Sequence, residues 1–269
     1  MNRLRQVFAD VQAKHHKVLV PYITAGYPDV ATSVEILTRL DPARLGCVEL
    51  GIPFSDPIAD GPVIQTSVSR ALESGFKLDP LLAALTAARD RIRVPLIAML
   101  SYSIVFRRTP AEFVQRARAA GLDGLLVPDL AFEEAEELAA LCRQHDLPLV
   151  MMIAPTTAPA RRSRIAALSE PWIYYQSLAG VTGERAGLPP DLAAHVAELR
   201  GQTGKPICVG FGIARPEHVA AVCAVADGAI VGSAIVRRMN DAVDAGLKGA
   251  ALAIPLTAFI AELAAAVPR

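Results

Sequence analysis

Eight short apolar segments recur along this chain, each bounded by Gly, Pro or Asp and separated by longer segments with helical periodicity. A strand that helices cover on both faces has no solvated side, so it appears in the sequence as a nearly continuous apolar run. The alternation therefore predicts βαβ units and a parallel sheet. We expect strands at residues 18–24, 47–50, 95–100, 124–127, 148–153, 173–176, 206–209 and 229–231.

Leucine and alanine at spacings of three and four mark the helices between these strands. Asp79-Pro80 and Thr109-Pro110 are predicted helix starts, because a capping oxygen precedes a proline at the first helical position. A first helix is expected before the first strand. Further helices are expected at residues 78–91, 110–120 and 133–145 and in the closing segment 242–267.

Length and charge narrow the class of protein. The chain has 269 residues, 52% of them hydrophobic, which fits one barrel domain over 1–269 or two small domains. Lys plus Arg and Asp plus Glu both number 27, so the chain has no broad attraction for nucleic acid or anionic membranes.

The four cysteines form no CxxC pair and lie among apolar neighbours, which predicts buried free thiols in a reducing, cytoplasmic compartment. No histidine shows metal-ligand spacing.

Eight such units either close into a (β/α)8 barrel or form an open doubly wound sheet, and periodicity does not separate the two. In a barrel, the loops after the strands converge and carry the active site.

Glu49 lies in an apolar strand with Val48 and Leu50 on the opposite face, so its carboxyl should point into the barrel mouth. Burial there would raise the pKa of Glu49 and make it an acid or base near neutrality. A structural ion pair with a buried Arg or Lys is the alternative.

The loop after this strand carries Asp56 and Asp60 among prolines and glycines. Aspartate before Pro or Gly is by default a turn residue that bonds its own backbone. Alternatively, Asp60 returns over the same pocket as Glu49, where two carboxylates can divide the acid and base work.

Glycine motifs after the last two strands predict a phosphate site. Gly210-Phe211-Gly212 follows the seventh strand, and Gly232-Ser233 follows the eighth and opens a helix. Glycines let backbone N–H groups approach an anion, and a helix N-terminus adds partial positive charge. The alternative is a pair of ordinary connecting turns. The Gly-rich segment from Ser177 to Pro190, which follows the sixth strand, is expected to be a mobile lid or a plain connection.

Several of these motifs resemble one family, the tryptophan synthase α-subunits. The resemblance rests on 20–28 (VPYITAGYP), 49–65 (ELGIPFSDPIADGPVIQ), 179–183 (AGVTG), 210–213 (GFGI) and 232–236 (GSAIV), in that order. It covers the chain from Arg3 to about Arg238. It implies a single (β/α)8 TIM barrel with an extra N-terminal helix, and a lyase that cleaves indole-3-glycerol phosphate into indole and glyceraldehyde 3-phosphate without a metal or an organic cofactor.

The resemblance also implies residue roles. Glu49 matches the general acid–base residue, and Asp60 matches the carboxylate that engages the indole N–H. Phosphate-binding positions match Gly183, Gly212, Gly232 and Ser233. Thr182 matches the lid residue that meets Asp60. Positions in or near the indole-pocket wall are Tyr22, Ile64, Leu100, Leu126, Tyr174 and Phe211.

Two departures stand out. Tyr22 replaces the Phe of some relatives, and Leu178 replaces an Arg, so contacts at the pocket wall and the anchoring of the lid are expected to differ.

A partner is implied as well: a pyridoxal-phosphate β-subunit that receives indole through a tunnel, in an α2β2 heterotetramer. We expect the loop 53–62 and the strand exit near Asp129 to face it. Two competing functions are another phosphate-sugar barrel enzyme, such as an isomerase or epimerase, and a non-catalytic activating subunit. The former has no reason to keep both Glu49 and Asp60, and the latter should have lost one of them.

Overall fold

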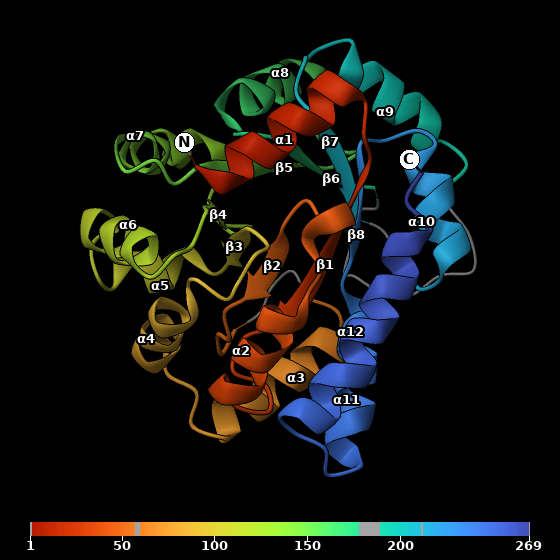
Figure 1. The fold of residues 1–269 in the computed structure, drawn as a ribbon. Helices are drawn as coiled ribbons and strands as arrows, with labels where there is room; N and C mark the ends of the chain where they lie inside the picture. The colour runs from red at the N-terminus through yellow and green to blue at the C-terminus, as the bar shows by residue number, and fades with distance from the viewer. Residues whose placement is uncertain (1, 57–59, 178–188, 211, 269) are drawn as a thin grey trace.

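The barrel closes through its first strand. A computed structural model describes residues 2–56, 60–177, 189–210 and 212–268. Its eight strands are parallel and pair in chain order, and β1 pairs with both β2 and β8 (Figure 1). The predicted (β/α)8 TIM barrel is confirmed, and the open sheet is wrong. The strands are β1 (Val18–Thr24), β2 (Val48–Gly51), β3 (Leu96–Met99), β4 (Gly124–Leu126), β5 (Leu149–Ile153), β6 (Ile173–Gln176), β7 (Ile207–Gly210) and β8 (Gly228–Val231).

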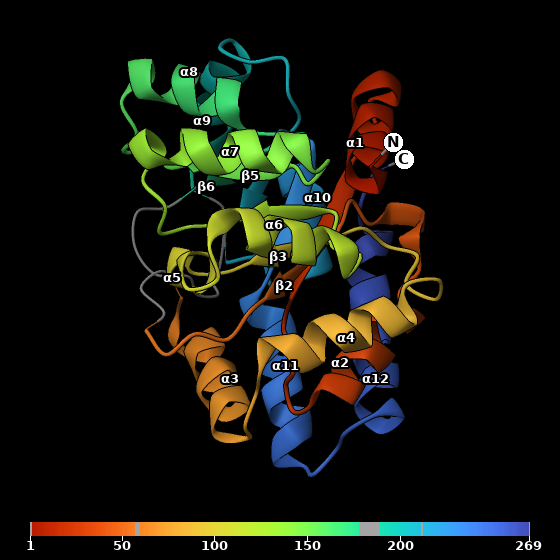
Figure 2. The ribbon, with the colours of Figure 1, turned by 90° about the vertical axis from the view of Figure 1, so that its left-hand side faces the viewer.

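Helices surround this barrel, and α1 precedes the first strand as predicted (Figure 2). None of the helices among the described residues is long and apolar enough to cross a membrane. The α-helices are α1 (Arg3–Lys14), α2 (Val30–Arg39), α3 (Pro62–Glu73), α4 (Leu78–Ala88), α5 (Tyr102–Phe106), α6 (Pro110–Ala119), α7 (Ala135–Gln144), α8 (Pro159–Leu168), α9 (Leu192–Arg200), α10 (Pro216–Cys223), α11 (Ser233–Asp244) and α12 (Ala250–Ala265). The short 3-10 helices are η1 (Pro42–Arg44) and η2 (Phe132–Glu134).

The predicted strand limits agree with the observed ones to within one residue, whereas helix limits differ more. Thr109 caps α6 as predicted, because its hydroxyl accepts a hydrogen bond from the N–H of Glu112. The prediction that Asp79 caps the helix expected at residues 78–91 is wrong. That helix, α4, begins at Leu78, and Asp79 lies in its first turn. The carboxylate instead bonds Arg108 and Arg116, so a tertiary ion pair takes the place of the local cap.

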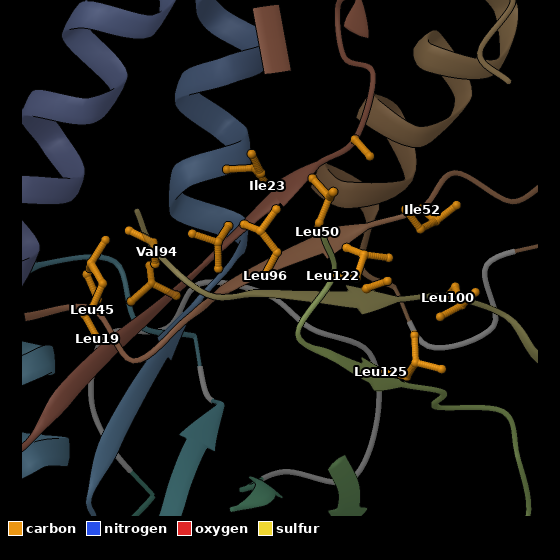
Figure 3. Packing of buried hydrophobic residues seen from close by; sticks show 14 of the residues in the cluster. Leu19, Ile23, Leu45, Leu50, Ile52, Val94, Leu96, Leu100, Leu122 and Leu125 are labelled. Atoms are coloured by element: carbon orange, nitrogen blue, oxygen red, sulfur yellow. The ribbon is translucent and has the colours of Figure 1, made fainter. Parts of the chain in front are cut away.

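Side chains of the strands alternate between two apolar layers. One layer lies between the strands and the surrounding helices, where Figure 3 shows Ile23, Leu50 and Leu96. The other fills the barrel interior and includes Leu126 and Tyr174. All four cysteines are buried and free, as predicted. Because Val48 and Leu50 belong to the outer layer, the residue between them faces inward.

Helix α1 packs against the interior layer at the end of the barrel where the strands begin. Phe8 stacks on Trp172, with ring centroids 5.4 Å apart. Asn2 caps the helix and also donates hydrogen bonds to the carbonyls of Asp123 and Asp146. The carboxylate of Asp123 is fully buried and accepts bonds from Arg3, at 2.6 Å, and from the N–H of Leu96. These contacts attach α1 to the strand starts.

Asp123→Ala should lower the free energy of unfolding by about 2–4 kcal/mol, because it leaves a buried N–H and part of a guanidinium without their partner. Urea denaturation measures this value. The exposed Asp10, which pairs with Lys14 at 3.2 Å, provides the control. Asp10→Ala should change stability by less than about 0.5 kcal/mol. Equal effects of the two substitutions would contradict the anchoring role of Asp123.

Candidate active site

Glu49 is a carboxyl group enclosed by the barrel. Its side chain belongs to β2, lies beside Tyr22 of β1 in register, and is 1% exposed. Its Oε1 atom has no hydrogen-bond partner among the described residues. Burial raises the pKa of Glu49 from 4.5 to about 8, because the charged form loses its hydration. Among the described residues, no Arg or Lys forms an ion pair with Glu49. The raised pKa keeps the carboxyl protonated at neutral pH and available for chemistry.

Asp60 approaches the same region from the start of α3. It precedes Gly61, the N-cap of that helix, and its carbonyl accepts a hydrogen bond from Gln65 Nε2 at 2.9 Å. Partial burial raises the pKa of its carboxyl from 3.8 to about 6. Asp60 is therefore ionised at neutral pH while Glu49 is protonated, so the two carboxyl groups hold opposite protonation states in one site.

A cleft of about 490 Å³ opens at the rim where the strands end. Asp60, Tyr22 and Leu100 line it, together with Gly51. Glu49 does not line the cleft itself. It lies across from Tyr22 on the neighbouring strand and two residues before Gly51 on β2, and both of these residues line the cleft. The pKa of Tyr22 is raised first by burial and then by the negative charges of Asp60 and, less strongly, Glu49. Both carboxyl groups thus lie close to one tyrosine.

Aromatic and aliphatic side chains form the walls. Tyr22 and Ile64 belong to one small apolar cluster, whereas Leu126 and Tyr174 lie deeper, within the barrel. Burial raises the pKa of Tyr174 as well, with Glu49 the next cause. Tyr22 and Tyr174 therefore lie near both carboxyl groups, whereas Ile64 packs in the cluster of Tyr22 and Leu126 in that of Tyr174. Thr182, Gly183 and Phe211 lie outside the described residues, as do Leu178 and most of the predicted lid.

Two strand-end glycines make room for the tyrosines. A methyl group at Gly51 would overlap the Tyr22 hydroxyl, and one at Gly210 would overlap the Tyr174 hydroxyl. From the sequence, Gly210 was predicted only as part of a phosphate loop, and Gly51 was assigned no role. Their role in accommodating a ring on the neighbouring strand depends on register, which the sequence does not display.

The start of α11 has the features of an anion site. Gly232 is its N-cap, and Ser233 is its first residue and is buried. No side chain of the described residues caps the helix. The first turn contains no acidic residue, so its N–H groups and partial positive charge remain available to an anion. A Cβ atom on Gly232 would lie 3.6 Å from Tyr22, so this helix end adjoins the cleft wall. Gly212, also predicted to bind phosphate, lies half-buried after β7.

A hydrogen-bonded link that was not predicted joins the exits of β3 and β4. Asp129, after β4, accepts a hydrogen bond from Ser101 Oγ at 2.6 Å and another from the N–H of Tyr102 at 2.8 Å. Ser101 and Asp129 both line the cleft. Their position directly after two predicted strands was the available signal, but the pairing itself depends on the neighbouring placement of β3 and β4.

Comparison with known proteins identifies close relatives. The family described as "Tryptophan synthase alpha chain" matches residues 8–262. The tryptophan synthase alpha chain of Rhodopirellula baltica is 44% identical over 91% of this chain and 89% of its own length. That of Chloroflexus aurantiacus is 42% identical over the whole of both chains.

Solved structures agree. The tryptophan synthase subunit alpha of Legionella pneumophila superposes with a TM-score of 0.88 at 33% identity, covering 99% of this chain and 98% of that chain. A chain of the Pyrococcus furiosus tryptophan synthase complex gives 0.83 at 33% identity, covering 92% and 98%.

Glu49→Gln should stabilise the protein at pH 8 by about 2–4 kcal/mol, and the gain should shrink towards pH 5. The pKa of Glu49 is raised on folding, so between about pH 4.5 and pH 8 the folded protein keeps a proton that the unfolded chain has released. Wild-type stability therefore falls as pH rises through this window, and a neutral amide removes that dependence. Urea denaturation at both pH values measures it. A gain of equal size at pH 5 would exclude the pKa of Glu49 as the cause.

Proposed function

The chain belongs to the tryptophan synthase alpha chain family, and we propose that Glu49 and Asp60 carry out its reaction. It is a lyase of tryptophan biosynthesis that cleaves indole-3-glycerol phosphate into indole and glyceraldehyde 3-phosphate. The observation that carries the residue assignment is the pair of carboxyl groups with opposite protonation states beside Tyr22.

Protonated Glu49 acts first as a general acid. The bond to be broken joins indole C3 to the glycerol phosphate chain, and aromatic indole is a poor leaving group. Transfer of the Glu49 proton to C3 makes an indolenine that accepts the bonding electrons. The C–C bond then breaks, the electron pair restores the aromatic ring, and the neighbouring chain hydroxyl becomes an aldehyde. Its proton returns to the Glu49 carboxylate, so the residue ends the cycle as it began.

Ionised Asp60 accepts a hydrogen bond from the indole N–H and stabilises the positive charge that develops on the ring nitrogen. A buried carboxylate does this better than an exposed one, because the surrounding medium screens its charge less. The pKa of about 6 supports the role, since Asp60 keeps its charge at neutral pH despite its burial. We propose that Thr182, which lies outside the described residues, meets Asp60 on closure.

The rest of the substrate spans the cleft. We assign its phosphate to the start of α11 at Gly232 and Ser233. We assign Gly212 and Gly183 to the same site, Gly183 lying outside the described residues. The indole ring packs against the wall residues. These are Tyr22, Ile64, Leu100, Leu126 and Tyr174, with Phe211 from outside the described residues.

The competing functions have less support. A phosphate-sugar isomerase would share the glycine motifs but has no use for the Glu49 and Asp60 pair. A non-catalytic activating subunit would not keep an unpaired buried carboxyl, which costs folding stability.

Relatives of known structure include tryptophan synthase complexes, among them an a2b2 complex from Pyrococcus furiosus, and this supports partnership with a β-subunit. We propose that this chain forms an α2β2 heterotetramer with a pyridoxal-phosphate β-subunit, through the loop 53–62 and the β4 exit at Asp129. Phe106 of α5, which follows β3 on the same rim, is 69% exposed and supports an apolar contact there.

We also propose that residues 1–269 form one domain and that the protein lies in the cytoplasm. The four free buried thiols support this compartment.

The pH dependence of kcat/KM tests the two carboxyl assignments. Activity needs ionised Asp60 and protonated Glu49, so indole release should follow a bell with limbs near pH 6 and pH 8. Asp60→Asn should remove the acid limb and keep the alkaline one. Glu49→Gln should lower kcat by at least about 100-fold. Wild-type activity in folded Glu49→Gln, checked by circular dichroism, would refute the role of Glu49.

A second experiment tests the partner surface. A β-subunit should increase the rate of indole release, and Phe106→Asp should abolish that increase while leaving the unassisted rate unchanged. Ile254→Asp is the matched control, because Ile254 is also a large exposed apolar residue, at 54%, but lies on α12, away from α5 (Figures 1 and 2). Sedimentation velocity of the mixed chains measures complex formation. Equal losses in both variants would argue against this face.

A further inference from the structure

Asn240 joins the two helices that carry opposite ends of the proposed site. It lies on α11, and its Nδ2 atom donates a hydrogen bond to the carbonyl of Val63 at 3.1 Å. Val63 is the second residue of α3, three positions after Asp60. The Oδ1 atom of Asn240 is buried and accepts no hydrogen bond from the part of the chain that the structure describes. The bond therefore connects the helix that starts at Ser233 to the first turn that follows Asp60.

The Val63 carbonyl does not need the hydrogen bond from Asn240. The Val63 carbonyl lies inside an α-helix, where the residue four positions later supplies its ordinary bond. The orphaned Oδ1 atom opposes folding, since an unpaired buried polar atom costs about 1–3 kcal/mol. An aliphatic side chain of similar size would avoid that cost. A retained polar group of this kind requires an explanation beyond stability.

The two helices also touch near the cleft. A Cβ atom on Gly232 would lie 3.7 Å from Ile64 Cδ1, and Val236 packs with Ile64 and Tyr22 in one cluster. Gln65 holds the Asp60 carbonyl from the same helical turn that Asn240 contacts. The start of α11 is therefore connected to Asp60 through Ile64 and Gln65 of α3. The Asn240 bond attaches α11 to the same turn of α3.

We propose that Asn240 is a positioning residue, which sets the distance between the phosphate-binding start of α11 and Asp60. The inference rests on the proposed phosphate site and on the proposed role of Asp60. Asn240 touches no substrate. It favours ligands that engage both ends at once, because only those depend on the spacing of the two helices.

A second bond between the same helices provides a control. Arg70 of α3 pairs with Asp244 of α11 at 2.8 Å, and both side chains are substantially exposed. This pair lies towards the other end of the helices, remote from Asp60 and Gly232. If helix contact in general were what mattered, loss of either bond would have the same consequence.

The experiment compares Asn240→Leu and Asp244→Ala in the full chain. Calorimetry and competition measure the affinities for indole-3-propanol phosphate, which engages both ends, and for inorganic phosphate and indole, which each engage one. Asn240→Leu should weaken the two-ended ligand by about fivefold to tenfold and change each one-ended affinity by less than about twofold. Asp244→Ala should change none of the three. Asn240→Met, whose flexible side chain fills irregular gaps, replaces the leucine variant if that variant does not fold.

Three results would overturn the proposal. Unchanged affinity of the Asn240 variants for the two-ended ligand removes the positioning role alone. Equal loss for all three ligands means that the substitution damages the site generally. If inorganic phosphate does not compete with the analogue in the wild type, the phosphate assignment itself fails, and the positioning role falls with it.

Discussion

The pairing of β1 with β8 closes the barrel, and this closure determines where every strand side chain points. Because β1 pairs with both β2 and β8, every strand has a neighbour on each side, and each side chain points either into the barrel or towards the helices. Val48 and Leu50 occupy the helix layer, so Glu49 between them has only the interior to face. Closure also brings all strand ends to one rim, where residues distant in the chain meet.

Burial of Glu49 in the closed barrel lowers folding stability and makes the carboxyl reactive. Water is removed from Glu49, which raises the pKa of the carboxyl into the range where an acid is useful at neutral pH. An unpaired Oε1 atom and a pH-dependent loss of stability accompany this gain. Asn240, with its own unpaired oxygen, is a second place where a polar group opposes folding and yet serves the geometry of the site.

Stabilising and reactive groups occupy opposite ends of the barrel. At the strand starts, carboxylates are fully paired: Asp123 with Arg3, and Asp227 with Lys17 and Arg200. The bonds from Lys17 and the backbone lower the pKa of Asp227 despite the opposing effect of burial. At the strand ends, Glu49 and Asp60 have raised pKa values because burial acts on them without such partners. Pairing, more than burial, decides which carboxylates are inert.

The strand positions and the candidate site residues followed from the amino-acid sequence alone. Short apolar runs located all eight strands, and the inward direction of Glu49 followed from the period of a strand. It did not determine partners that lie far apart along the chain. Asp79 was expected to cap a helix locally but pairs with Arg108 and Arg116. The fit of Tyr22 over Gly51, the link between Ser101 and Asp129, and the bond from Asn240 to Val63 arise from strand register and helix packing. Local periodicity specifies which face a residue occupies. Only the closed tertiary structure decides what faces it, because that depends on three-dimensional distances between segments that the sequence order leaves open.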